Sequence, residues 1–242
     1  MQNLFKFSLT VGLAASVTLS GCAKDPSKEV AAAKVEEPKA KAAPAKPAEA
    51  VAKVKPAAKA VAAEAKPAEA KAAAEGISLS GDVFFTGSKA TGSHECKFDK
   101  WSGKMTLAGA KAEGGSLSID IQVDSVVADF RKPIPIWSEK LAGHLKGADF
   151  FNAEKFPKAT FASTEIKLGG VDGKGTHTVA GNLTIRGKTK AVTFPADIKV
   201  EGGKVNASAK FSINRKDFGI EYPGKKDDLI RDGVVLELNF KS

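Results

Sequence analysis

Residues 177–213 read HTVAGNLTIRGKTKAVTFPADIKVEGGKVNASAKFSI, and the fold of the chain can be worked out from this stretch. Apolar and polar residues alternate along it, which is the pattern of β-strands with one buried face. Gly187-Lys188 and Gly202-Gly203 separate the alternating runs, and glycine supplies the positive φ that two-residue hairpin loops require. The stretch therefore predicts three antiparallel strands joined by two tight hairpins.

A loop at Gly202-Gly203 sets a register in which all opposite pairs are apolar. These pairs are Val200/Val205, Ile198/Ala207, Ala196/Ala209, Phe194/Phe211 and Val192/Ile213. A loop at Gly187-Lys188 adds three pairs on the same face, which are Leu183/Val192, Gly181/Phe194 and Val179/Ala196. Turn chemistry and the period of two thus predict the same apolar face.

This apolar face mixes very small residues with large ones. Gly181, Ala196, Ala207 and Ala209 share it with Phe194, Phe211 and Ile198. A core filled by its own side chains usually places a large residue opposite a small one, but here two alanines face each other. The pattern predicts spare room inside, either for a ligand or for another helix or sheet that packs there.

The rest of the folded part predicts five more strands and one short helix. The strands are expected at 77–85, 98–107, 117–123, 159–168 and 234–240, with a turn-rich loop at 87–92. Phe98 is out of phase with Trp101, which predicts a β-bulge. Ser138 is a candidate N-cap for a helix that ends near Gly147. Eight antiparallel strands with short links predict an all-β fold, an up-and-down β-barrel.

The chain has 242 residues and a formal net charge of +9. Its basic residues are spread over a low-complexity segment and over alternate strand positions, with no concentrated stripe. Proteins that bind nucleic acid gather such residues on one face. The distribution therefore predicts no nucleic-acid partner.

Residues 1–21 have the pattern of a signal peptide, with a basic start and an apolar core that is too short to span a bilayer. Leu19-Ser20-Gly21-Cys22 resembles the bacterial lipobox, which implies cleavage before Cys22 and acylation of that cysteine. Ala23 after it resembles the outer-membrane sorting pattern. We expect a protein of the cell envelope, lipid-anchored to the outer membrane and facing the periplasm. Ordinary secretion with a free Cys22 thiol is the alternative.

Residues 22–76 are expected to form a lipid-anchored, disordered linker between the signal peptide and a barrel domain at 77–242. The segment consists mostly of Ala, Lys, Pro, Glu and Val, and its prolines leave pieces too short for a stable helix, with transient helix expected around 57–66. It has no aromatic residue with which to build a core. As an extended tether it would hold the barrel on the order of 100 Å from the membrane.

His94 and three long segments resemble the signature segments of the YceI family. The segments are HLKGADFFNAEKFPKATFAST (144–164), VAGNLTIRGKTKAVTFPA (179–196) and SINRKDFGIEYPG (212–224). The resemblance covers residues 77–242 and implies a lipocalin-like eight-stranded barrel. It also implies a long apolar ligand in the lumen, such as a polyisoprenoid or fatty amide, with the ligand's head group near the mouth. Cys96 departs from the family pattern.

Inward positions of the predicted barrel are the candidate ligand-lining residues. They are Val83, Phe85, Trp101, Ile119, Ile121, Val123, Phe161, Gly181, Leu183, Val192, Phe194, Ala196, Ile198, Ala207, Ala209, Phe211, Leu236 and Leu238. His144 and Arg215 are candidates for contact with a polar head group. The competing interpretation of His144 is a purely structural histidine. The competing interpretation of Arg215 is an ion pair with Asp217 that holds a loop in place.

The sequence has few residues arranged for catalysis or metal binding. His94 and Cys96 lie two positions apart, but two ligands without a third make a poor metal site. With Cys22 acylated, Cys96 has no disulfide partner and is expected to be buried and inert. There is no nucleophile elbow, phosphate-binding glycine loop or dinucleotide fingerprint. We therefore expect no enzyme, no cofactor and no metal.

Two classes of function remain open at this stage. The first is binding, carriage or sequestration of a long-chain apolar lipid in the barrel lumen. The second is a non-catalytic structural or adhesive module, displayed on a membrane tether, whose lumen is packed with side chains.

Overall fold

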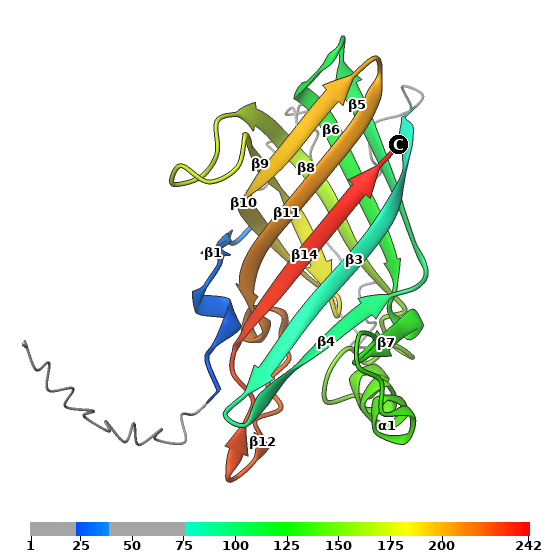
Figure 1. Ribbon diagram of the computed structural model, residues 1–242, viewed down its shortest axis with the longest axis vertical. Coiled ribbons are helices and arrows are strands. Elements are labelled where there is room, and N and C mark those ends of the chain that lie inside the picture. Colours follow the sequence, from blue (N-terminus) through cyan, green and yellow to red (C-terminus); the bar gives the residue numbers. More distant parts are fainter. Residues whose placement is uncertain (1–22, 39–75) are drawn as a thin grey trace, which may run out of the picture.

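The computed structural model describes residues 23–38 and 76–242, so Cys22, the signal peptide and most of the predicted linker lie outside the described residues. Eight antiparallel strands close into a barrel, as predicted (Figure 1). They are β3 (Ile77–Lys89), β5 (Trp101–Ala108), β6 (Lys111–Gln122), β8 (Lys158–Leu168), β9 (His177–Ile185), β10 (Lys188–Glu201), β11 (Lys204–Asn214) and β14 (Gly233–Lys241). The barrel closes because β14 pairs with both β3 and β11.

β3 is longer than predicted and has a different partner at each end. Its first residues pair with β5, and its last residues, which fall in the turn-rich loop expected at 87–92, pair with β4 (Gly92–Phe98). β4 in turn pairs with β7 (Val126–Ala128). Phe98 ends β4 and Trp101 begins β5. The change of phase therefore marks a boundary between two strands, and the predicted bulge was wrong.

The short helix α1 (Pro135–Lys146) lies at one end of the barrel (Figure 1). It begins three residues before Ser138, with Pro135 in the first helical position, where a missing N–H costs nothing. Ser138 is not the N-cap, since its buried hydroxyl lies inside the helix. At the same end of the barrel are η2 (Val123–Ser125), η3 (Arg215–Phe218) and the small hairpin of β12 (Gly224–Lys225) and β13 (Asp228–Leu229).

The two central hairpins follow the predicted turn chemistry, one of them shifted by a residue. Gly202 and Gly203 have φ of 57° and 78°, and Val200 pairs with Val205 as predicted. The other loop is Arg186-Gly187 instead of Gly187-Lys188, with φ of 52° and 70°. The resulting pairs are Leu183/Lys190, Gly181/Val192 and Val179/Phe194. Because this register differs from the predicted one by two residues, every side chain stays on its predicted face.

β10 and β11 separate toward the α1 end of the barrel. Their ladder runs from Glu201/Lys204 to Asp197/Ser208, so the predicted pairs Ala196/Ala209, Phe194/Phe211 and Val192/Ile213 are not formed. Pro195 lies just beyond the last pair and has no N–H to donate. The rings of Phe194 and Phe211 still stack, with centroids 4.1 Å apart. The two strands therefore stay in contact through side chains where their backbones part.

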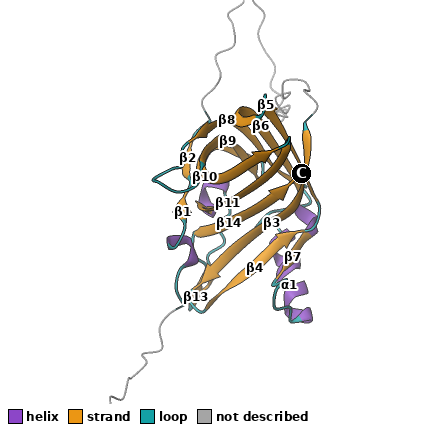
Figure 2. Cartoon of the chain, turned by 45° about the horizontal axis from the view of Figure 1, so that its top comes forward, coloured by secondary structure: helices purple, strands orange, loops and turns teal. Residues whose placement is uncertain are grey.

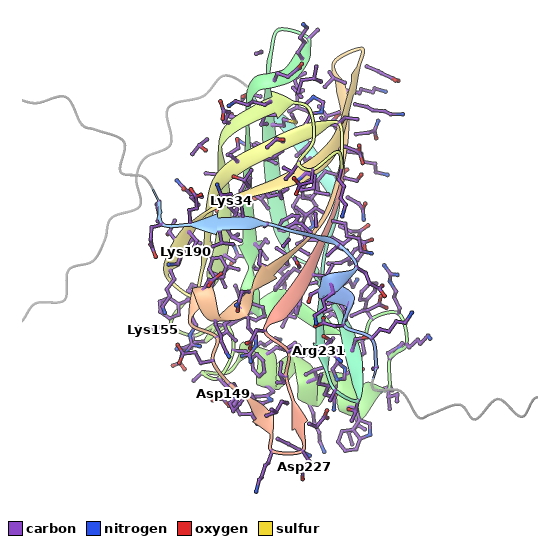
Figure 3. The ribbon with its side chains drawn as sticks, turned by 90° about the vertical axis from the view of Figure 1, so that its left-hand side faces the viewer. Lys34, Asp149, Lys155, Lys190, Asp227 and Arg231 are labelled. Atoms are coloured by element: carbon purple, nitrogen blue, oxygen red, sulfur yellow. The ribbon has the colours of Figure 1, made fainter. Side chains whose placement is uncertain are left out.

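Residues 23–38 cross this gap as a strap on the outside of the barrel (Figures 2 and 3). The strap contains η1 (Pro26–Lys28), β1 (Ala31–Ala32), which pairs with β11, and β2 (Lys34–Glu36), which pairs with β10. Ala33 adds a hydrogen bond of 2.8 Å from its N–H to the carbonyl of Ser212. Figure 3 shows Lys34 and Lys190 where the strap crosses β10.

The strap corrects the prediction of a tether that begins at residue 22. Ala31, Ala33 and Val35 are partly buried while Ala32 and Lys34 are exposed, which is the alternation of a β-strand. Because residues 23–38 lie against the barrel, a reach on the order of 100 Å no longer follows from the linker's length.

Small residues inside the barrel are covered by neighbouring rings. A Cβ added to Gly181 would lie 2.5 Å from Cζ of Phe161, so this ring occupies the space that the glycine leaves. Ala207 pairs with Phe240, whose ring packs on Trp101 with centroids 4.9 Å apart. The end of the barrel away from α1 is thus a filled core.

Replacing Gly181 with alanine tests this packing. We expect the free energy of unfolding in urea to fall by about 1–3 kcal/mol, because the methyl group meets the Phe161 ring and the carbonyl of Ala162. Gly143→Ala on α1 is the control, since no atom lies within 4 Å of its added Cβ and alanine favours a helix. Equal stability of Gly181→Ala and wild type would show that the ring is free to move.

Candidate ligand-binding site

The half of the barrel near α1 encloses an apolar cavity of ≈ 150 Å³. Phenylalanine rings form much of its wall, with Phe85 contacting Phe98 at 5.3 Å and Phe151 at 5.8 Å between centroids. Among the residues that line it, only Thr160 and Arg215 are polar. Apolar cavities of this size stay free of water and accept apolar guests.

A second space, the vestibule, adjoins the cavity and has a volume of ≈ 270 Å³. Its wall comes from α1, from the β3–β4 hairpin and from residues 222–230. The residues shared by vestibule and cavity are Phe85, Gly87, Leu145, Phe150 and Ile230. The two spaces therefore meet at a common apolar wall, and the vestibule lies on the α1 side.

Polar groups are concentrated in the vestibule. The hydroxyl of Ser88 is buried and has no hydrogen-bond partner among the described residues. Nδ1 of His94 lies 2.9 Å from Oδ1 of Asp129. The ammonium group of Lys89 donates a hydrogen bond to Asp228, which lowers the pKa of that carboxyl group. The vestibule thus offers hydrogen-bonding groups next to a cavity that has almost none.

The structure places eleven of the eighteen predicted lining residues at the cavity. They are Val83, Phe85, Ile119, Ile121, Phe161, Leu183, Val192, Phe194, Phe211, Leu236 and Leu238. The other seven do not line it, which corrects the prediction for Trp101, Val123, Gly181, Ala196, Ile198, Ala207 and Ala209. The reason for the strand residues is that the lumen is hollow only near α1, whereas the period of two marks inward positions along the whole strand. Val123 is at the α1 end, but it lies in η2 and not on a strand.

Several lining residues come from connecting segments that the strand pattern did not mark. Phe150 and Phe151 follow α1, while Phe218 and Ile220 flank the end of η3. The available signal was the presence of large apolar residues in segments without strand periodicity. In the structure these residues fold over the α1 end of the barrel and close the cavity at that end.

Arg215 is a structural residue, because its side chain makes four hydrogen bonds within the fold. Its side chain is 4% exposed and donates to the carbonyls of Ile220, Ile230 and Arg231 at 2.7–3.3 Å. Its carboxylate partner is Asp232 at 3.0 Å, and not Asp217 as the alternative interpretation had it. The guanidinium group therefore ties residues 220–232 to the barrel.

His144, the other head-group candidate, lies in the wall of the vestibule. Its Nε2 is 3.1 Å from Oδ2 of Asp149, and its ring contacts Phe150 and Tyr222 edge-on at 4.9 and 5.1 Å between centroids. The side chain is 42% exposed. His144 is thus held in place by neighbours but remains accessible from the vestibule.

Cys96 is a free, buried thiol in the vestibule wall. Burial raises the pKa of Cys96 to about 12, which keeps the thiol protonated at neutral pH. The described residues contain no group of three or more His, Cys, Asp or Glu side chains that could hold a metal ion. Among the helices of residues 23–38 and 76–242, none is long and apolar enough to cross a membrane.

Arg215→Ala tests the structural role of the guanidinium group. We expect a loss of about 3 kcal/mol in the free energy of unfolding, because three carbonyls and Asp232 lose a buried charged donor. Lys216→Ala is the matched control, since Lys216 also pairs with Asp232 but is half-exposed, and its loss should cost less than about 1 kcal/mol. Equal effects of the two changes would contradict this assignment.

The thiol of Cys96 should react slowly with iodoacetamide. Against an ordinary value of 9.0, a pKa of about 12 leaves roughly a thousandfold less thiolate at pH 8, so we expect alkylation slower than in the urea-unfolded protein by about that factor. The rate in the folded protein should also keep rising above pH 9 instead of levelling off. A Cys22→Ser background makes Cys96 the only thiol. Fast alkylation at pH 8 in the folded state would refute the burial argument.

Comparisons with known proteins agree with this fold. A family model described as the YceI-like domain matches residues 53–242. A UPF0312 protein of Pseudomonas putida (strain W619) is 32% identical over 148 residues, which cover 58% of this chain and 70% of that protein. A UPF0312 protein of Pseudomonas fluorescens (strain Pf-5) is 33% identical over 151 residues, which cover 59% and 68%.

Two solved structures share the fold. BcnA of Burkholderia cenocepacia superimposes with a TM-score of 0.52 at 24% identity, covering 66% of this chain and 96% of that one. A polyisoprenoid binding domain from Saccharophagus degradans gives a TM-score of 0.51 at 16% identity, covering 68% and 95%. Because the family model matches most of the chain, over residues 53–242, the chain belongs to the YceI-like domain family.

Proposed function

We propose that the barrel binds an amphiphilic lipid with a long apolar chain, whose tail lies in the cavity and whose polar head lies in the vestibule. The observation that carries this proposal is the direct contact between a nearly all-apolar cavity and a vestibule with hydrogen-bonding groups. The role is one of binding, carriage or sequestration, and not of catalysis. A polyisoprenoid is the preferred ligand class, since the similar domain from Saccharophagus degradans is named for binding one.

The tail is driven into the cavity by the hydrophobic effect. Transfer of each CH₂ group from water to an apolar wall stabilises the complex by about 0.8 kcal/mol. Aromatic rings such as Phe194 and Phe211 present flat apolar surfaces to a chain, and Leu236 and Leu238 remain only partly buried without one. A cavity of ≈ 150 Å³ takes one segment of a long chain, and the remainder extends toward the vestibule.

The head group has partners in the vestibule. Ser88 has a buried hydroxyl without a partner, which is costly unless a ligand or water supplies a hydrogen bond. His144 and Tyr222 lie in the same wall. These groups suit a small uncharged or weakly polar head group, such as an alcohol or a phenol, better than a large ionic one.

Attachment to the cell envelope is part of the same proposal. The lipobox-like segment before Cys22 supports acylation of that residue, and Ala23 supports sorting to the outer membrane facing the periplasm. A protein held at a membrane has access to lipids that are almost insoluble in water. The anchor and the cavity thus support a common role.

Leu236→Trp tests the proposal by filling the cavity. Solvent extraction of the purified protein followed by mass spectrometry should show about tenfold less bound lipid than in wild type, because the indole takes the place of the chain. The melting temperature of the lipid-free variant should change little, since the added ring enters empty space.

Ala209→Phe is the comparison variant for the same experiment. Ala209 faces the interior but does not line the cavity, so the ring should overpack the core and cost about 1–3 kcal/mol of stability. A packed structural module would give a different result: no lipid in the wild type and an equal loss of stability in both variants.

A further inference from the structure

Exposed apolar side chains lie at the end of the barrel that holds the vestibule, and we call this surface the rim. Of the five large apolar side chains that are most exposed in the described residues, four lie here: Ile134 (61%), Ile136 (60%), Trp137 (62%) and Leu229 (56%). The first three lie at the start of α1, and Leu229 lies on β13. Figure 1 shows α1 and the β12–β13 hairpin at the same end of the barrel. Exposed apolar residues grouped in this way mark a contact surface.

Basic residues accompany these apolar ones. Residues 131–146 contain Arg131, Lys132, Lys140 and Lys146 but a single acidic residue, Glu139. Nζ of Lys140 lies 4.9 Å from the centroid of the Trp137 ring. On the other side of the vestibule, Lys225 and Lys226 are exposed at the turn of the β12–β13 hairpin, beside the exposed Asp227. Tryptophan flanked by lysine is typical of surfaces that enter the head-group layer of anionic membranes.

The start of the strap is fixed to the same rim. The N–H of Ala23 donates to the carbonyl of Ala90 at 3.1 Å, in the turn between β3 and β4. Arg231 donates to the carbonyls of Ala23 and Lys24, and Figure 3 places Arg231 beside the strap. Since Cys22 is bonded to Ala23, a lipid anchor at Cys22 would be attached next to a residue that is bonded to the β3–β4 turn, beside Lys89 of the vestibule wall.

We propose that this rim docks on the surface of an anionic phospholipid bilayer, with Ile134, Ile136, Trp137 and Leu229 in the head-group layer and the basic residues on lipid phosphates. The vestibule then faces the bilayer, and a lipid chain passes between membrane and cavity without crossing bulk water. The docking surface is separate from the cavity. Docking itself therefore does not depend on the proposed lipid binding. Passage of a lipid chain from the membrane to the cavity does depend on it.

Vesicle flotation tests the docking without the help of an anchor. The protein is the chain from residue 22 onward, which contains every described residue, with Cys22→Ser to prevent acylation. Vesicles of phosphatidylglycerol and phosphatidylethanolamine should carry the protein upward at low salt, and pure phosphatidylcholine vesicles should carry much less. The triple variant Ile136→Ser, Trp137→Ser, Leu229→Ser should bind about tenfold more weakly or worse.

Leu168→Ser is the matched control. Leu168 is 71% exposed but lies at the end of β8 and does not line the vestibule, so its loss should leave flotation unchanged. Brominated phospholipids should quench the fluorescence of wild type but not of Trp137→Phe, whose remaining tryptophan, Trp101, packs against Phe240 inside the barrel.

Three outcomes would overturn the proposal. They are no flotation with anionic vesicles, equal flotation of the triple variant and Leu168→Ser, and self-association in gel filtration that the triple variant abolishes.

The lipid content of the triple variant separates docking from ligand binding. A variant that no longer floats but still holds lipid supports both proposals, whereas flotation of a wild-type protein that holds no lipid supports docking alone.

Discussion

Pairing of the backbone along the seam between β10 and β11 is the constraint on which the rest of the structure depends. A barrel is stable because it leaves no strand edge unpaired. Here two neighbouring strands separate beside the cavity, and their exposed backbone groups need partners. The strap supplies these partners, through β1 on β11 and β2 on β10. The strands thus separate beside the hollow part of the barrel, and the docked N-terminal segment pairs with the strand edges that this separation exposes.

The barrel is divided into a filled half and a hollow half. Far from α1, buried residues such as Met105, Val205 and Phe240 pack without a large space between them. Near α1, rings surround the cavity, and the segment from Phe218 to Ile230 covers that end. Cavities lower stability, so the filled half and the hydrogen bonds of Arg215 offset what the hollow half loses. This division explains why inward-facing positions at different heights have different roles.

The position of the strap also relates ligand binding to the membrane. The chain enters the fold beside the vestibule, so the anchor that we propose at Cys22 would lie at the same end of the molecule as the exposed side chains at the start of α1. A long apolar ligand has very low solubility in water, so its transfer from a membrane to a protein is slow when the ligand has to cross water. A cavity whose vestibule faces the membrane avoids that step.

Local sequence determined the strand faces and the tight turns, because alternation and positive-φ residues act over a few neighbours. Gly202-Gly203 shows this directly, and even the shifted loop at Arg186-Gly187 left the faces unchanged. Contacts between distant residues were decided only by the tertiary structure. The Phe161 ring fills the space at Gly181, and Arg215 bonds to Asp232 instead of the nearby Asp217. The strap lay within a composition typical of disorder, and its alternation became meaningful only because β10 and β11 left an edge to pair with.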